Sequence, residues 1–334
     1  MNTVATGDAH GKLILVGEHA VIHGFPAVAV PLSPVSVVAS YRGHRGPFRL
    51  ITEFGTGDLV SGPDPTAGLR ACLRATFATL DLRGVDHELV VQGSIPIGVG
   101  LGSSAAVAVA CVRAIFAAAG QVPDPAALRA LADIAEQHAH GSPSGVDVAC
   151  VSLDSAISYT RNNGPEPVQL GRPLTLVVAD SGMPSRTRDA IAHVRERQTR
   201  FPRRTGHLLA EIGELAGPMR VALEEGKPEL AGRILDRSQE ALRALNLSVP
   251  ITDRLAEAAR RAGAWGAKTT GAGLGGSVVA VAPGGFAAQS IKRALLAAGA
   301  RHSWIVTIGK EVATCPMSGA GKTISSTGLR RQMR

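Results

Sequence analysis

Aromatic residues make up only 3% of this 334-residue chain, which has two tryptophans and two tyrosines. Proteins that bind nucleic acid by base stacking need aromatic platforms, so this scarcity argues against such a role, although the formal net charge is +8. The arginines are spread along predicted helices such as 186–204 and 254–261. We therefore expect no nucleic-acid partner and interpret the charge as a diffuse field that attracts small anionic substrates.

Cysteine pairs and long apolar runs are also missing. Cys72, Cys111, Cys150 and Cys315 form no Cys-x-x-Cys pair, so the sequence indicates neither a zinc site nor a disulfide framework. No apolar run reaches the roughly 18 residues that cross a bilayer, and the first ten residues lack a signal-peptide pattern. We expect a cytoplasmic protein that binds no membrane, with enough hydrophobic residues (45%) for two domains.

A glycine-rich turn is present at Pro96–Ala106, P-I-G-V-G-L-G-S-S-A-A. The preceding stretch His87–Val91 alternates like a strand, and Ser103–Ala119 is an alanine-rich helix candidate. The N-terminus of such a helix directs free N–H groups and a positive dipole at an anion. The same order occurs in tight structural turns, and a dinucleotide site would need a further glycine and a later acidic residue that are missing. We predict a phosphate loop for ATP.

A second stretch, Gly319–Thr323 (G-A-G-K-T), ends like a Walker A loop, but Pro316 occupies the position of the first glycine. The residues around it show no periodic apolar pattern up to Arg334. We predict a mobile tail at 316–334 and no nucleotide site there.

The pattern of predicted elements indicates an α+β protein of two domains, 1–165 and 170–315. In the first half we expect strands at 13–16, 27–32, 35–41, 48–52, 87–91 and 156–160 and helices near 66–80, 103–119 and 125–140. Asp124-Pro125 is a typical helix start, whereas Gly164–Pro167 is predicted to be a linker. In the second half we expect a strand at 174–179, helices on one face from 187–262 with breaks near Pro218, Pro228 and Pro250, a helix at 286–298, and strands at 277–281 and 304–308.

Two segments carry side chains suited to catalysis. Gly11–Gly24 places Lys12 and the pair Glu18-His19 around an apolar strand. Glu136 precedes Asp147 by a turn that could bring both carboxylates to one site, and carboxylates with a hydroxyl and phosphate oxygens suit Mg²⁺. Plain structural alternatives remain: a solvated strand-end lysine, a solvated helix end and a turn-capping aspartate.

Two further groups complete the motifs. His138 and His140 are two residues apart and lie on different helix faces, so we interpret them as structural. Lys268–Ser277 is a second glycine loop that leads into a strand. It is either a simple hairpin or bulge, or a cover for the nucleotide from the other domain.

In this order and spacing, the segments resemble the GHMP small-molecule kinases, and within them the mevalonate kinases, over about residues 9–281. The discriminating motif is Gly-Glu-His-Ala-Val-Ile-His-Gly at 17–24, because galactokinases typically continue Gly-Glu-His with Thr-Asp. The resemblance implies an N-terminal domain like ribosomal protein S5 and a ferredoxin-like C-terminal domain. It also implies phosphorylation of mevalonate to 5-phosphomevalonate in isoprenoid biosynthesis, with ATP and Mg²⁺; a homodimer is compatible with it.

Two alternatives stay open. One is a GHMP kinase for another small alcohol, such as phosphomevalonate or a mevalonate-like acid. The other is a non-catalytic nucleotide-binding protein on the same fold, because a fold does not fix a function.

The resemblance also implies roles for single residues. Lys12 and Asp147 would be catalytic and flank the alcohol, while Ser104 and Glu136 would hold Mg²⁺. The residues implied for ATP are Pro96, Gly98, Gly100, Leu101, Gly102, Ser103, Ser104, Ala105 and Gly273, and those implied for the substrate are Glu18, His19, Arg161 and Thr187.

Four positions depart from the family pattern. His10 stands where many relatives have proline, Leu274 interrupts the glycine run, Ser277 replaces a common cysteine, and Asp154-Ser155 stands where Gly-Gly is frequent. The last departure weakens the assignment of Arg161.

Overall fold

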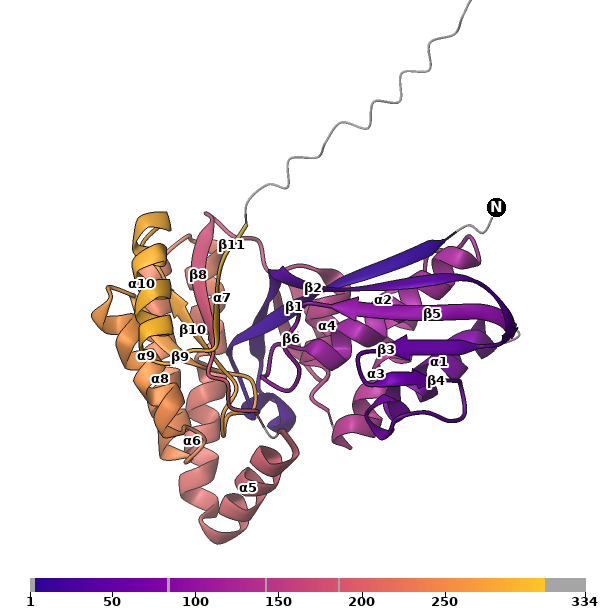
Figure 1. Ribbon diagram of the computed structural model, residues 1–334. Helices are drawn as coiled ribbons and strands as arrows, with labels where there is room; N and C mark the ends of the chain where they lie inside the picture. Colours follow the sequence, from indigo (N-terminus) through magenta and orange to yellow (C-terminus); the bar gives the residue numbers. More distant parts are fainter. Residues whose placement is uncertain (1–3, 83–84, 142, 186, 310–334) are drawn as a thin grey trace, which may run out of the picture.

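The computed structural model describes residues 4–82, 85–141, 143–185 and 187–309. Two bodies lie side by side, each built around its own β-sheet (Figure 1). The α+β class expected from the sequence is therefore confirmed. The predicted tail at 316–334, with Gly319–Thr323 and Cys315, lies outside the described residues.

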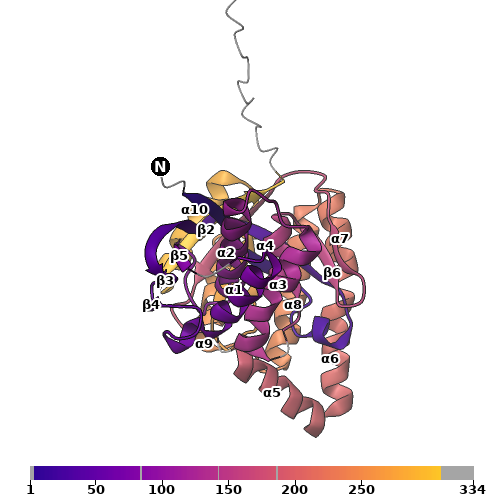
Figure 2. The same ribbon diagram turned by 90° about the vertical axis from the view of Figure 1, so that its right-hand side faces the viewer.

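The N-terminal body holds a seven-stranded sheet in the order β4-β3-β5-β2-β6-β7, with β1 paired to β2. Only the β3–β5 pairing in this sheet is parallel among the described residues. Its strands are β1 (Ala5–Val16), β2 (Ala27–Pro47), β3 (Arg49–Thr52), β4 (Gly55–Gly57), β5 (Val85–Gly93), β6 (Ile157–Thr160) and β7 (Gly164–Pro167). Its helices, gathered on one side in Figure 2, are α1 (Ala67–Thr79), α2 (Ser103–Ala118), α3 (Pro125–His140) and α4 (Val146–Leu153), with short 3-10 turns at Ala20–His23 and Asp64–Thr66.

Helix α2 is the buried centre of this body. It is apolar on almost every face and packs against β1 and β2 as well as α1, α3 and α4. A side chain at Gly7 would collide with the backbone of α2 at Ala110 and Ala114. Small residues on both sides therefore allow β1 to cross α2 closely, which fixes the strand that carries Lys12.

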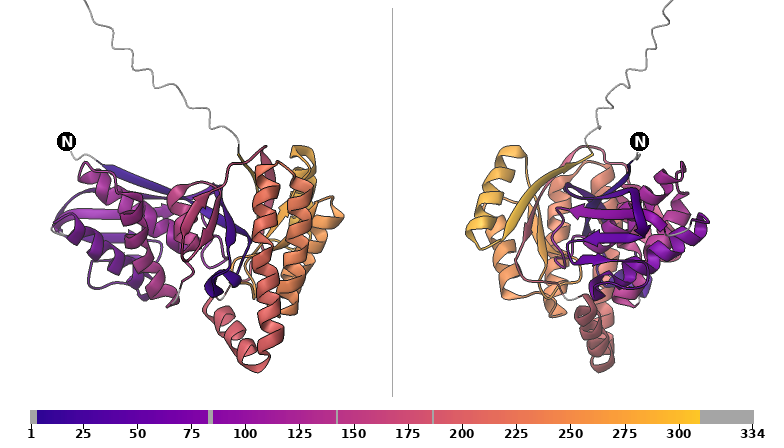
Figure 3. Two further views of the ribbon diagram at one scale, coloured as in Figure 1. Left: turned by 180° about the vertical axis from the view of Figure 1, so that it is seen from behind. Right: turned by 45° about the vertical axis from the view of Figure 1, so that its right-hand side comes forward.

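The C-terminal body holds a four-stranded antiparallel sheet in the order β11-β8-β10-β9. Its strands are β8 (Leu174–Asp180), β9 (Gly266–Thr270), β10 (Ser277–Val281) and β11 (His302–Ile308). Its helices are α5 (Thr187–Arg200), α6 (Pro202–Glu214), α7 (Ala216–Glu224), α8 (Pro228–Ala244), α9 (Pro250–Arg261) and α10 (Gly285–Ala297). Helix α5 and the adjoining end of α6 project beyond both sheets (Figure 3).

The two faces of this sheet have different partners because side chains alternate along a strand. On β8, Val177 and Ala179 pack with α9 and α10, while Leu176 and Val178 join a core that includes α7, α8 and the strands of the N-terminal body. The expectation of helices on one face is thus wrong, since α8 lies on the opposite side. One continuous core joins the two bodies.

Gly164–Pro167 is not a linker but strand β7, which pairs with β6. The prediction was wrong because β7 lies at the edge of its sheet, where the missing N–H groups of Pro165 and Pro167 leave no inner ladder incomplete. The boundary between the two domains stays a prediction.

Other differences concern breaks and short elements. The two strands expected at 27–32 and 35–41 are one continuous strand, β2. A register shift in its pairing with β1 accommodates the residues between them. The break expected near Pro218 is confirmed, because α6 ends at Glu214 and α7 begins at Ala216, which places Pro218 in the first turn of α7, where proline is tolerated. Helix α4 and strand β9 were not predicted at all. The helix start at Asp124 is confirmed, because its carboxylate accepts hydrogen bonds from the N–H groups of Ala126 and Ala127.

No helix in the described part of the chain has the length and apolar character of a membrane span. Within that part, Cys72, Cys111 and Cys150 are buried free thiols.

Candidate active site

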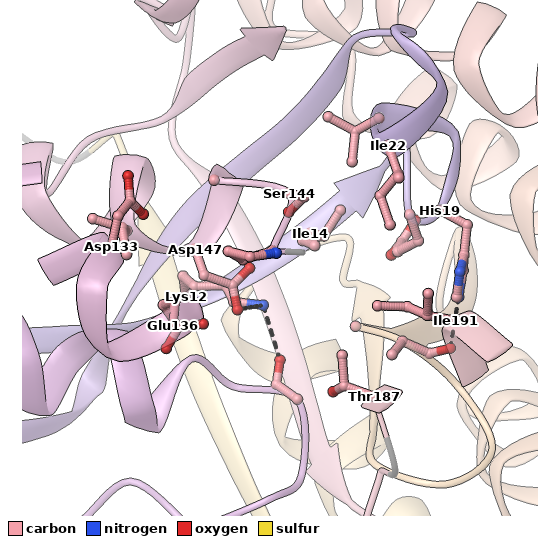
Figure 4. A pocket seen from close by; sticks show the side chains of 18 residues that line it. Lys12, Ile14, His19, Ile22, Asp133, Glu136, Ser144, Asp147, Thr187 and Ile191 are labelled. Carbon is pink, nitrogen blue, oxygen red and sulfur yellow. Dashed lines mark hydrogen bonds and ion pairs between the residues drawn. The ribbon is translucent and has the colours of Figure 1, made fainter. Parts of the chain in front are cut away.

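A pocket lies between the two bodies, bordered by β1, α3, α4, α5 and the loop after β9 (Figure 4). It brings together side chains that lie far apart in the sequence. The predicted site residues that line it are Lys12, Glu18, His19, Gly100, Glu136, Asp147 and Thr187.

Lys12 and Asp147 form the polar centre of the pocket. The Lys12 Nζ lies 3.0 Å from Asp147 Oδ2 and donates a hydrogen bond to the Gly100 carbonyl at 3.2 Å. The side chain of Lys12 is 2% exposed, whereas that of Asp147 is 30% exposed. A fixed ammonium therefore faces a carboxylate that a substrate can reach.

Asp147 lies in the first turn of α4, a helix that the sequence analysis did not predict. The helix begins after Gly145, whose φ of +88° favours glycine, and a side chain there would collide with the hydroxyl of Tyr159. A negative charge in a first turn is stabilised by the helix dipole. The local fold thus places the Asp147 side chain at the pocket edge, at the N-terminal end of α4.

The predicted phosphate loop has the expected geometry. Gly98, Gly100 and Gly102 all adopt positive φ, and α2 begins directly after them without a side-chain cap. A Cβ at Gly102 would lie 2.8 Å from Lys12 Cγ, so this glycine also makes room for the lysine. Leu101 and Ala105 are buried, so their contact with a nucleotide stays a prediction.

The second glycine loop packs directly behind the first. A Cβ at Gly271 would lie 3.1 Å from Gly100 Cα, and Ser277 Oγ donates to the Val99 carbonyl at 3.0 Å. Gly273 has a φ of +84° and its carbonyl accepts a hydrogen bond from Ser185 Oγ at 3.0 Å. Leu274, which interrupts the glycine run, has a φ of +56°, a conformation that leucine rarely adopts.

Glu136 lies on α3 beside this loop and is buried. Burial and the neighbouring Asp147 carboxylate raise the pKa of Glu136 to about 7, while its hydrogen bond with the Ser104 side chain acts in the opposite direction. A carboxylate, a hydroxyl and a second nearby carboxylate form a donor set that fits Mg²⁺. The described residues contain no cluster of three or more His, Cys, Asp or Glu suited to a metal, so ligands from a nucleotide would have to complete the shell.

Glu18 and His19 line the pocket but are already engaged by the C-terminal body. Glu18 is ion-paired with buried Lys268, and burial raises the pKa of Glu18 while Lys268 lowers it. His19 Nε2 lies 2.8 Å from the Ala272 carbonyl, and burial lowers the pKa of His19 to about 4. Because a carbonyl only accepts, neutral His19 carries its proton on Nε2.

Other predicted residues have mixed placements. Thr187 lines the pocket at the start of α5, but the exposed Arg161 does not; its guanidinium donates instead to the carbonyl of Pro143. His138 contacts the Ile134 carbonyl within its own helix, as its structural interpretation predicts. The role of Arg161 in substrate binding therefore stays a prediction without support from the pocket lining.

Sequence reasoning missed three residues. Asp133 and Ser144 line the pocket, and Lys268 lies beneath it. Asp133 lies one helical turn before Glu136, so the i,i+3 spacing could have identified it. Lys268 was part of the second glycine motif, but it gave no signal of its partner because Glu18 is distant in the sequence.

Two departures from the family pattern contact each other. His10 Nδ1 lies 3.0 Å from Asp154 Oδ1, which joins β1 to the C-terminal end of α4. The side chains are 29% and 48% exposed, so the pair adds little to stability.

Comparison with known proteins agrees with this geometry. Models of the GHMP kinases N terminal domain and the GHMP kinases C terminal domain match residues 68–155 and 219–301. A mevalonate kinase of Aeropyrum pernix is 33% identical, with 84% of this chain and 89% of the relative aligned, and one of Pyrococcus horikoshii is 31% identical over 83% and 88%.

Solved structures show the same fold. The structure of L. major mevalonate kinase in complex with R-mevalonate has a TM-score of 0.81 at 24% identity, covering 93% of this chain and 98% of that one. The mevalonate kinase of Staphylococcus aureus has a TM-score of 0.68 at 27% identity, covering 92% and 99%. From its two matched domains and its relatives, this chain belongs to the GHMP kinase family and, within it, to the mevalonate kinases.

Proposed function

We propose that this protein transfers the γ-phosphoryl group of ATP to the primary alcohol of mevalonate, forming 5-phosphomevalonate and ADP. The observation that carries the proposal is the contact of Lys12 with Asp147 beside the phosphate loop. The names of the relatives supply the substrate, because the pocket chemistry alone fits several small alcohols.

In the proposed reaction, the alcohol oxygen forms a bond to the γ-phosphorus while the bond to the ADP oxygen breaks, and the alcohol proton passes to Asp147. Carboxylates are much weaker bases than alkoxides, so this proton moves late and positioning supplies most of the rate. Lys12, held by the Gly100 carbonyl, stabilises negative charge on the attacking oxygen and on the transferred group.

Mg²⁺ is part of the proposal. Ser104 and Glu136 are the residues that would hold it, and the raised pKa of Glu136 supports a cation there, since a buried carboxylate beside another favours a positive neighbour. The ion would offset the charge of the β- and γ-phosphates. The residues proposed for the nucleotide are those of the phosphate loop together with Gly273.

A coupled ADP-release assay over mevalonate, phosphomevalonate, homoserine and galactose tests the substrate. We expect turnover with mevalonate and little with the other three. If the protein phosphorylates phosphomevalonate but not mevalonate, the proposed substrate is wrong. If it binds ATP but phosphorylates none of the four compounds, the non-catalytic alternative is favoured. An assembly of two chains stays a prediction, which light scattering of the purified protein can test.

A further inference from the structure

Glu18 and Lys268 join the two bodies beneath the pocket. Glu18 follows β1, Lys268 lies in the middle of β9, and Lys268 Nζ donates to Glu18 Oε1. The side chains are 1% and 0% exposed. The ion pair is therefore almost completely withdrawn from water where the two bodies meet, although Glu18 still borders the pocket.

Stability alone does not explain two charges at this position. Taking both groups out of water is unfavourable, and apolar residues of similar volume often stabilise an interior as well or better. The same strands are already joined by neutral groups, because Thr270 Oγ1 donates to the Ile14 carbonyl at 2.9 Å and accepts from the Ile14 N–H at 3.1 Å. The charge of Lys268 therefore needs an explanation other than stability.

The second oxygen of the Glu18 carboxylate indicates a role for the pair in substrate binding. Glu18 Oε2 is buried without a hydrogen-bond partner among the described residues, and Glu18 lines the same pocket as Lys12 and Asp147. A buried acceptor without a donor is unfavourable, and an ionised carboxylate can only accept. A hydroxyl of a bound substrate would supply the missing donor.

We propose that Lys268 is a positioning residue of the substrate pocket: it holds Glu18 Oε1 so that Oε2 accepts a hydrogen bond from a substrate hydroxyl. The inference rests on the proposed function. Because Lys12 and Asp147 take the alcohol that is phosphorylated, Glu18 takes the tertiary hydroxyl of mevalonate. The negative charge of Glu18 also repels the substrate carboxylate, which therefore binds in another part of the pocket.

Steady-state kinetics of Lys268→Met, Glu18→Gln and the double variant test this role. We expect each single variant to raise the KM for mevalonate at least about tenfold, the effect of losing a charged hydrogen bond, while the KM for ATP stays within about twofold. The double variant should be no worse than either single variant, because the two residues act as one unit. It should also melt at a higher temperature than Lys268→Met, since no unpaired buried charge remains.

Thr270→Val is the matched control. It removes neutral hydrogen bonds across the same interface, two residues from Lys268, so it should lower the melting temperature and leave the KM for mevalonate unchanged. If the double variant regains both its melting temperature and a normal KM, the pair is only structural and the inference is overturned. That outcome is informative even if Lys268→Met does not fold.

A substrate analogue identifies the hydroxyl directly. With wild-type protein, 5-hydroxy-3-methylpentanoate, which lacks the tertiary hydroxyl, should have a KM at least about tenfold higher than mevalonate. With the double variant the two compounds should have similar KM values. Equal KM values in the wild type would overturn the role of Glu18 and Lys268 alone, whereas a wild type that does not phosphorylate mevalonate would overturn the proposed function and this inference together.

Discussion

The ammonium of Lys12 and the carboxylate of Asp147 lie 3.0 Å apart, one from a strand and the other from the first turn of a helix distant in the sequence. The carbonyl of Gly100 binds the same ammonium. Three motifs thus meet at one atom, Lys12 Nζ.

Asp147→Asn should preserve the fold but lower kcat about 10²–10⁴-fold, because the amide is nearly isosteric yet cannot take the proton of the alcohol. Circular dichroism and single-turnover kinetics measure both effects. The matched control is Asp154→Asn at the other end of α4, where an exposed carboxylate contacts His10 and lies outside the pocket lining. Near-normal kcat in Asp147→Asn would remove the residue from the mechanism.

Ser104→Ala and Glu136→Gln should each raise the Mg²⁺ concentration needed for half-maximal activity, since each removes an oxygen ligand or its charge. Titration of activity with Mg²⁺ at saturating ATP measures this. Ser103→Ala, one residue away at the same helix start, should have a smaller effect. Unchanged half-saturation in both main variants would contradict a shared metal site.

His19 should make the protein less stable as the pH falls. Its pKa is about 4 in the fold, because of burial, and about 6.5 in the unfolded chain. Between pH 6.5 and pH 4, His19 is protonated in the unfolded chain but stays neutral in the folded protein. The free energy of unfolding therefore falls as the pH falls, by about 3 kcal/mol at pH 4. Above pH 6.5 His19 is neutral in both states, so it no longer lowers the free energy of unfolding.

Urea unfolding of wild type and His19→Gln from pH 7 to pH 4 isolates this contribution. Glutamine can still donate to the Ala272 carbonyl but does not titrate, so the variant should lose less stability over this window. Parallel pH profiles for the two proteins would show that His19 is protonated as easily in the fold as outside it.

Gly145→Ala should disturb the start of α4 and with it Asp147. The position has positive φ, which disfavours alanine by about 1 kcal/mol, and the new methyl group would meet the Tyr159 hydroxyl. We expect lower kcat and a lower melting temperature. Adding Tyr159→Phe should recover part of both losses by removing the hydroxyl; no recovery would mean that backbone strain alone causes the defect.

The sequence by itself determined the elements whose signals are local. Glycines at 98, 100 and 102 followed by an alanine-rich run predicted a phosphate loop and α2, and Asp124-Pro125 predicted the start of α3. The motif at 17–24 predicted the family, because it is a short continuous stretch whose residue types and spacing can be recognised in the sequence alone.

Only the tertiary structure decided which side chains meet. Gly164–Pro167 became a strand because its neighbour β6 was available at a sheet edge, and α4 formed because Gly145 could turn against Tyr159. Glu18, expected to contact the substrate, is also the partner of Lys268. Such pairings depend on burial and on contacts between distant segments, and no local preference of the chain encodes them.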